Sequence, residues 1–156
     1  MNAETGSLVP SFVVFQLGTR HVALPRECVA ELVASPVQFS FPHTTPQITG
    51  VILRRGRIVP VLDLGPGVLG APSPTARFYL VVERRVSDIP ERCAIPVQGE
   101  CELVTGILLA ATGQDEFVIG SLDFNGEMIE VLDLEKAIAA SAASMQEPVL
   151  AGEARS

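Results

Sequence analysis

Two aspartates occupy matching places in the chain and are the residues best suited to acid–base chemistry. Asp63 and Asp133 each stand in a Val-Leu-Asp-Leu sequence, seventy positions apart. Aspartic proteases build their catalytic dyad from one such carboxylate in each half of a duplicated fold. That chemistry needs a small hydroxyl residue and a glycine after each aspartate, whereas Leu64 and Leu134 follow here. We therefore expect each carboxylate to close a strand by accepting hydrogen bonds from local backbone amides.

The histidines and cysteines form no second catalytic constellation. His21 and His43 lie twenty-two positions apart without a companion cysteine, which suits neither a metal site nor a catalytic triad. Cys28, Cys93 and Cys101 are odd in number and include no Cys-x-x-Cys pair, so we interpret them as small apolar packing residues. Phosphate-binding loops, dinucleotide fingerprints and nucleophile elbows are absent from the sequence. The sequence predicts no enzyme activity, no metal and no cofactor.

Arginines are concentrated at one point of an otherwise acidic chain. Arg54, Arg55 and Arg57 are three of eleven basic residues, in a chain whose formal net charge is -7. A guanidinium can grip a carboxylate with a planar fork, which favours Arg at protein contacts. The alternative is an ordinary solvated turn. The acidic balance opposes binding to nucleic acid or anionic lipid, so the expected partners are proteins.

The elements that must position these residues occur twice. The segment ITGVILRRGRIVPVLDL at 48–64 matches VIGSLDFNGEMIEVLDL at 118–134. A second stretch aligns as well, since Ala-Leu-Pro at 23–25 resembles Ala-Ile-Pro, and Glu-Leu-Val at 31–33 recurs, about seventy-one positions later. Ahead of both copies lie runs of β-branched and aromatic residues that suit strands. The repeat predicts two copies of one β unit.

Turn residues indicate how each copy folds. Asn125–Gly126 is a strong hairpin signal, because a type I′ turn needs positive φ at both central positions. We expect a hairpin over 122–133 and, by the repeat, one over 48–64 with its turn at Arg55–Gly56. The glycine- and proline-rich stretch 65–76 cannot continue a ladder and separates the copies.

The predicted organisation is all-β with two or three short helices. Helices are expected at 25–33, which begins with proline, and at 134–141, which is rich in alanine. The N-terminus has no basic residue ahead of an apolar run and no run reaches spanning length, which predicts a cytoplasmic protein without membrane insertion. The predicted parts are a disordered N-terminus (1–10), a first subdomain (about 12–64), a linker (65–76), a second subdomain (about 77–134), a closing helix (134–141) and a flexible tail (142–156), the folded domain being 11–141.

The run GVILRRGRIVPVLDL resembles the signature GVxNLRGxIxPVxDL of the CheW family of chemotaxis adaptors. FVVFQLGTRHVALPRECVAEL is similar to the family's opening strands and short helix, and GSLDFNGEMIEVLDLEKAI to its closing hairpin and helix. The resemblance covers about 12–139. It implies two intertwined five-stranded β-barrels of SH3-like form, in accord with the duplication, and it implies no enzymatic activity.

The resemblance also implies partners. CheW-type proteins bridge the regulatory domain of the histidine kinase CheA to the cytoplasmic tip of methyl-accepting chemoreceptors. By position, the signature arginine falls on Arg55 and the signature glycine on Gly50, while Val29 and Glu31 fall on helix positions implicated in receptor or kinase contact. The predicted partner-binding residues are thus Val29, Glu31, Gly50, Arg54, Arg55 and Arg57.

The sequence departs from the family pattern beside these positions. Leu53 and Arg54 replace the usual Asn and Leu before the signature arginine, and Glu100 stands at a usually apolar position. We expect docking through an exposed barrel edge to the kinase domain, with another groove gripping the receptor hairpin. Two other functions stay open: a scaffold of the same fold in twitching motility or a surface-sensing pathway, and a small barrel enzyme or ligand carrier.

Overall fold

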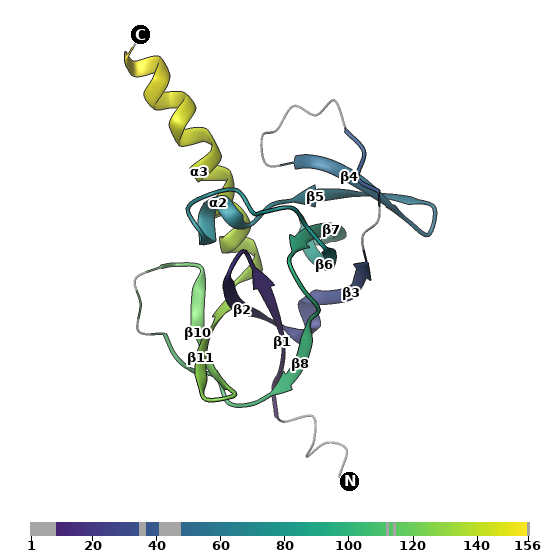
Figure 1. Cartoon of the computed structure of the whole chain (residues 1–156), viewed down its shortest axis with the longest axis vertical. Helices are drawn as coiled ribbons and strands as arrows, with labels where there is room; N and C mark the ends of the chain where they lie inside the picture. The colour runs from purple at the N-terminus through teal and green to yellow at the C-terminus, as the bar shows by residue number, and fades with distance from the viewer. Residues whose placement is uncertain (1–8, 35–36, 41–47, 112, 114, 156) are drawn as a thin grey trace.

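Two curled β-sheets form the body of the protein, and a long helix runs beside them (Figure 1). The computed structural model describes residues 9–34, 37–40, 48–111, 113 and 115–155, with side chains as far as residue 144. The expectations for residues 1–8 and for His43 lie outside the described residues. None of the helices in these ranges is long and apolar enough to cross a membrane.

The strands divide between the two sheets without regard to their order in the chain. Sheet A contains β1 (Ser11–Leu17), β2 (Arg20–Pro25), β8 (Glu102–Thr105), β9 (Leu109–Ala110), β10 (Val118–Phe124) and β11 (Glu127–Leu132). Sheet B contains β3 (Val29–Ala34), β4 (Ile48–Arg54), β5 (Arg57–Leu62), β6 (Phe78–Val86) and β7 (Ile89–Val97). Sheet A has the order β8-β1-β2-β11-β10-β9, and sheet B has the order β3-β6-β7-β5-β4.

The two sheets have equivalent strand arrangements, and each sheet combines strands from both copies of the sequence repeat. In the sequence repeat, strands β1 to β5 correspond to β6, β7, β8, β10 and β11, so each sheet takes two of these ten strands from one copy and three from the other. The parallel pairs match as well, since Val131 faces Ala23 in sheet A and Val61 faces Ala94 in sheet B. The SH3-like barrels are therefore intertwined. The ranges 12–64 and 77–134 describe the sequence copies, whereas each barrel draws on both.

In each sheet, a glycine leaves room for a neighbouring backbone segment at the sheet edge. Phe39 pairs with β4 in sheet B. Leu109, which lies seventy positions after Phe39 in the chain, belongs to β9 and pairs with β10 in sheet A. Strand β9 thus gives sheet A six strands instead of the expected five. A Cβ on Gly50 would lie within 3.0 Å of the carbonyl oxygen of Phe39, and one on Gly120 would lie still closer to that of Leu109. Both glycines also sit at a register shift in their ladder. The repeated glycine therefore serves close backbone packing.

Three hairpins turn through two residues with positive φ. Asn125–Gly126 has φ values of 54° and 82°, and Arg55–Gly56 has 53° and 77°, which confirms both predicted turns. A third turn, Ser87–Asp88 with 53° and 68°, joins β6 to β7. The sequence did not predict it because it lacks the glycine that usually marks such a turn.

The helix predicted at 25–33 is wrong. Only Arg26–Cys28 forms a single 3-10 turn, and the next residues form β3, which pairs with β6 at an edge of sheet B. Pro25 does precede the turn as its N-cap, but the Val-Ala-Glu-Leu-Val run that follows the turn gains a ladder of hydrogen bonds with β6. Tertiary pairing thus overrides the local signal.

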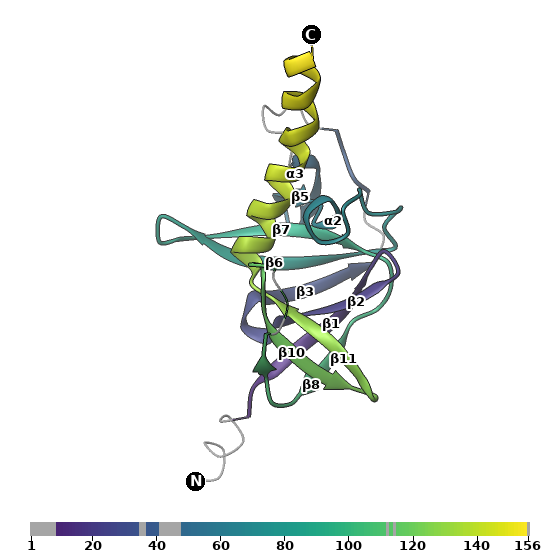
Figure 2. The ribbon, with the colours of Figure 1, turned by 90° about the vertical axis from the view of Figure 1, so that its left-hand side faces the viewer.

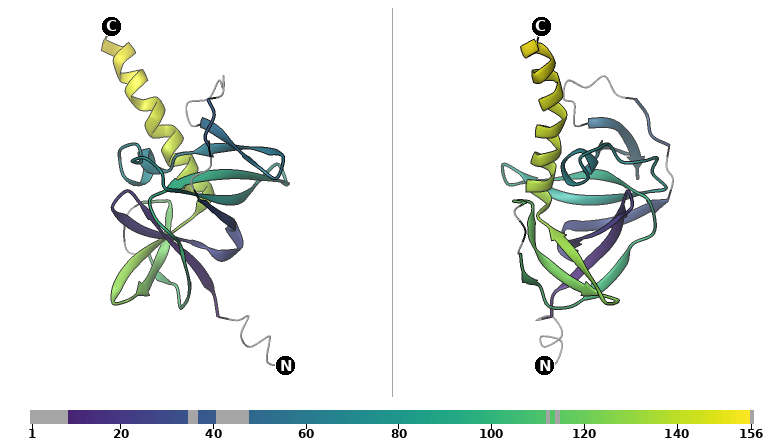
Figure 3. Two further views of the ribbon diagram at one scale, coloured as in Figure 1. Left: turned by 45° about the vertical axis from the view of Figure 1, so that its right-hand side comes forward. Right: turned by 60° about the vertical axis from the view of Figure 1, so that its left-hand side comes forward.

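The two other helices lie against each other. The linker contains α2 (Gly65–Val68), where the Gly67 N–H donates to the Ser141 hydroxyl of α3 at 3.1 Å. Helix α3 starts at Leu134 as predicted but runs to Arg155, so its backbone is helical through most of the predicted flexible tail. Figures 2 and 3 show α3 extending beyond the sheets, at the opposite end of the molecule from the start of β1.

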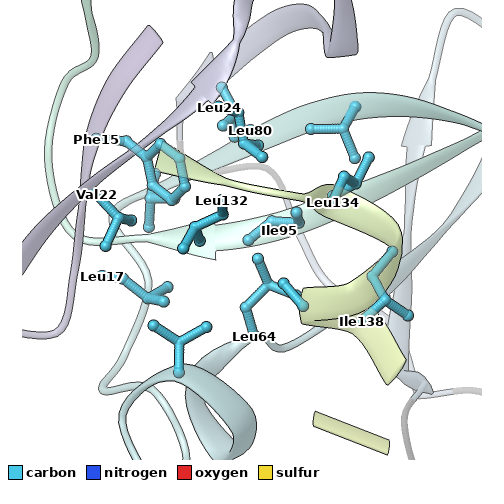
Figure 4. Close-up of a cluster of buried hydrophobic side chains, with 14 of the residues drawn as sticks. Phe15, Leu17, Val22, Leu24, Leu64, Leu80, Ile95, Leu132, Leu134 and Ile138 are labelled. Carbon is cyan, nitrogen blue, oxygen red and sulfur yellow. The ribbon is translucent and has the colours of Figure 1, made fainter. Parts of the chain in front are cut away.

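One hydrophobic core joins the sheets and the helices. Figure 4 shows side chains from both sheets and from α3 converging, among them Phe15, Leu80, Leu132 and Ile138. Each barrel also holds a smaller cluster of its own, and the clusters contain repeat-related residues such as Val131 in sheet A and Val61 in sheet B. A shared core of this kind fixes the two barrels relative to one another.

Candidate functional site

The carboxylates of Asp63 and Asp133 accept hydrogen bonds from backbone N–H groups, as expected. Buried Asp63 accepts hydrogen bonds from Gly65 N (2.8 Å) and from the hydroxyl and N–H of Ser73 (2.5 and 2.9 Å). Asp133 accepts one from the N–H of Lys136 (3.0 Å) at the start of α3. Both carboxylates are thus engaged in closing a strand or capping a helix.

The cysteines are packing residues, also as expected. All three are free thiols, and burial raises the pKa of Cys93 to about 12 and that of Cys101 to about 11. Burial, followed by the charge of Glu27, raises the pKa of Cys28. The thiols stay protonated near neutral pH and are therefore weak nucleophiles. Across the described ranges, no group of three His, Cys, Asp or Glu side chains could hold a metal ion.

A cavity with a volume of about 710 Å³ lies on sheet A. His21 and Met128 contribute to its lining. Two of its charged residues, Arg20 and Glu130, form an ion pair with each other, and Arg20 also donates to the carbonyl of Val68 at 3.0 Å. These charges are committed to holding β2, β11 and α2 together.

The β4–β5 hairpin has one basic face and one apolar face, because residues paired across a ladder project to the same side. Arg54 pairs with Arg57, on the face of the buried Ile52. Leu53 pairs with Ile58 on the other face, and these two are 52% and 63% exposed. Figure 1 shows this hairpin extending outward at the right of the molecule. Its tip therefore presents both chemistries to solvent.

A bidentate ion pair ties the hairpin to the opposite edge of sheet B. Arg54 Nε lies 3.2 Å from Glu31 Oε2, and Arg54 Nη2 lies 2.7 Å from Glu31 Oε1. Glu31 belongs to β3 and Arg54 to β4, which are the two edge strands of this sheet. The pair therefore closes the barrel through side chains rather than through a backbone ladder.

The electrostatics of Glu31 follow from this contact. The hydrogen bond from Arg54 lowers the pKa of Glu31, partial burial opposes the shift, and the charges of Arg54, Arg55 and Arg92 lower it further. The same bond raises the pKa of Arg54. Glu31 is thus held as a carboxylate within a group of arginines. Arg92 reaches this group from β7, where its Nε also lies 3.8 Å from Oε2 of Glu83.

Arg55 stands apart from this closed pair. Its Nη2 lies 3.7 Å from Glu31 Oε1, beyond hydrogen-bond distance, and its side chain is 77% exposed. The side chain of Arg54 is 31% exposed and that of Glu31 is 20% exposed. Two neighbouring arginines therefore have different surroundings, one engaged in the barrel and one open to solvent.

The structure brings together three of the six predicted partner-binding residues. Glu31, Arg54 and Arg55 form the ion-pair group, and Arg57 is exposed on the same hairpin. The other two are built into the fold: Val29 is on β3, not on a helix, and packs half-buried against the main core, while Gly50 is buried.

Sequence reasoning missed the apolar part of this surface. Leu53 and Ile58 flank the arginines with an alternation that the sequence already displays, so their exposure could have been inferred. Phe39, which is 47% exposed beside β4, and Arg92 are placed there by pairing between distant segments, for which the sequence holds no local signal.

Beyond Phe39, none of the described residues pairs with the outer edge of β4. Val51 directs its N–H and C=O to Phe39 at 2.9 and 2.8 Å, and Pro60, which has no N–H, lies opposite Val51 in the ladder. Backbone groups alternate along a strand, so the N–H and C=O of Leu53 face that same edge. This edge can pair with a strand of another protein.

Comparison with known proteins assigns the fold and the family. The family model for the CheW-like domain matches residues 11–142. The crystal structure of the scaffolding protein TtCheW from Thermoanaerobacter tengcongensis is similar in fold, with a TM-score of 0.65, 21% sequence identity, and coverage of 81% of this chain and 85% of that chain. No match was found among curated proteins. Because the family model spans most of the sequence, this protein belongs to the CheW-like domain family.

Proposed function

We propose that this chain is a non-catalytic adaptor that couples methyl-accepting chemoreceptors to the regulatory domain of a CheA-type histidine kinase in the cytoplasm. Membership of the CheW-like family supports a role as a chemotaxis scaffold. The observation that carries the proposal is the β4–β5 tip, where the exposed guanidinium of Arg55 adjoins the exposed pair Leu53 and Ile58.

This combination of groups suits a protein partner. Arginine and large apolar side chains dominate the energetically important centres of protein interfaces. The guanidinium fork can take a carboxylate, the aliphatic pair can be buried, and the open edge of β4 at Leu53 can accept a strand. The hairpin thus offers polar, apolar and backbone contacts within one small area.

An adaptor with two docking surfaces acts by proximity. When it holds the kinase domain and the receptor tip at once, the second contact becomes effectively intramolecular and its local concentration rises. Modest pairwise affinities are then sufficient for a stable assembly. Because one core fixes the two barrels relative to one another, a second docking surface on the other barrel would keep a constant position relative to the β4–β5 tip.

Calorimetric titration tests the proposal. Wild type, Arg55→Ala, Arg55→Glu and the charge-matched control Lys136→Glu, on exposed α3, would each be titrated with the kinase regulatory domain and with a receptor tip fragment. We expect micromolar binding of the wild type, a loss of about 1–3 kcal/mol for Arg55→Ala, a larger loss for Arg55→Glu, and little change in the control. Failure of the wild type to bind either partner would contradict the proposed function.

A further inference from the structure

We infer that Arg54 is a positioning residue: by occupying Glu31 it leaves Arg55 free to bind a carboxylate on the partner protein. The inference rests on the proposed function, because it describes how the same hairpin recognises its partner. It concerns a position at which this chain departs from the CheW signature, where Arg54 stands in place of leucine.

Two arginines lie within reach of one carboxylate. Arg54 takes both oxygens of Glu31, at 3.2 and 2.7 Å, whereas the nearest nitrogen of Arg55 stays 3.7 Å away. A planar fork on a planar carboxylate is the strong arrangement for such a pair. Arg54 therefore holds the contact, and Arg55 keeps its donors available.

Backbone geometry gives the two arginines different directions. Arg54 is the last residue of β4 and projects on the side of buried Ile52, toward β3. Arg55 occupies the first turn position with φ of 53° and projects from the tip, 77% exposed. On this hairpin Arg54 is thus committed to Glu31, whereas Arg55, like Arg57, extends into solvent.

Removal of Arg54 would change the role of Arg55. Glu31 is only 20% exposed, and a partly buried carboxylate without a partner is costly. A side-chain rotation can close the 3.7 Å gap from Arg55 to hydrogen-bond distance. Arg55 would then neutralise Glu31, and its fork would no longer face the partner.

The partner chemistry follows from this arrangement. A free guanidinium beside the exposed Leu53–Ile58 pair fits a protein surface with a carboxylate next to an apolar patch. The exposed Arg55 contact is screened by salt, so binding should weaken as ionic strength rises. Arg54 thereby sets the number of cations that the hairpin offers to such a surface.

A mutant cycle tests the inference with the partner whose binding Arg55→Glu weakens. Arg54→Leu should weaken binding about tenfold, the loss of one charged contact, and Arg54→Leu/Glu31→Gln should restore it by removing the group that captures Arg55. Glu31→Gln also adds one unit of positive charge, so Arg57→Leu with and without Glu31→Gln measures that general effect. The gain in affinity from adding Glu31→Gln to Arg54→Leu must exceed the gain from adding it to Arg57→Leu. A double variant as weak as Arg54→Leu would overturn the inference.

A second measurement needs no partner. In Arg54→Leu the pKa of Glu31, followed by NMR titration, should remain below its ordinary value because Arg55 replaces Arg54, and it should rise in Arg54→Leu/Arg55→Leu. If the pKa of Glu31 already rose to its ordinary value in Arg54→Leu, the inference would be overturned, while the proposed function would still stand. Wild type that binds neither partner would instead overturn the proposed function, and with it the role assigned here.

Discussion

At the residue scale, the two repeat-related aspartates have different structural roles. Asp63 accepts three hydrogen bonds from Gly65 and Ser73, while Asp133 caps α3 through one backbone amide. The sequence allowed the prediction that the aspartate in each copy accepts hydrogen bonds from nearby backbone amides. The partner Ser73 was not, because it lies ten positions along the linker and is brought back only by the fold.

Replacement of each aspartate by asparagine separates these roles. Asp63→Asn should lower the free energy of unfolding by about 1–3 kcal/mol, because the amide nitrogen cannot accept a bond from Ser73 or Gly65. Asp133→Asn should change it by only a few tenths of a kcal/mol, since asparagine caps helices as well as aspartate does. Urea unfolding checks both variants. Equal effects at the two positions would contradict the assigned roles.

Glu31 makes folding stability depend on pH. Its pKa lies below the ordinary value of 4.5, chiefly through the hydrogen bond from Arg54. A carboxyl with a lowered folded pKa contributes stability above its unfolded pKa and loses it as pH falls through the folded pKa. Wild type should therefore be more stable than Glu31→Gln at pH 7, and the difference should shrink below pH 4.5. Urea unfolding across this range checks it, and a constant difference would refute the pairing.

At the element scale, sequence signals were reliable where a local conformation needs a particular residue. The turns at Arg55–Gly56 and Asn125–Gly126 were predicted because positive φ is specific to few residues. Strand β3 was predicted as helix because its identity depends on pairing with β6, a partner distant in sequence. Arg54 and Glu31 were both predicted as site residues, but their mutual contact depends on that same pairing.

The bulge glycines can be tested as a pair. Gly50→Ala and Gly120→Ala should each destabilise the fold by about 1–3 kcal/mol, because the added methyl meets a backbone carbonyl that cannot rotate away. Gly99→Ala is the matched control, since its Cβ would meet only the Gln16 side chain, at 3.5 Å. Thermal unfolding followed by circular dichroism measures all three. An unfolding temperature that Gly50→Ala leaves unchanged would mean that the segment containing Phe39 can move away from β4.

At the scale of the whole molecule, the exchange of strands makes the two barrels one folding unit. Duplication was readable from the repeat, and the intertwined arrangement was expected only from the family resemblance. Composition and periodicity could not predict it, because the two copies would fill a barrel equally well by pairing within themselves. The fold selects exchange through contacts such as Val61 with Ala94, which join different copies.

Sedimentation velocity can show whether one copy of this protein holds a kinase domain and a receptor tip together, as we propose. A fluorescently labelled CheA-type regulatory domain would be sedimented with the receptor tip fragment, with and without the adaptor, using wild type and Arg55→Glu. We expect a labelled species containing all three proteins with wild type and the loss of this species with Arg55→Glu. Binding of the kinase domain and the receptor fragment only in separate, mutually exclusive complexes would contradict it.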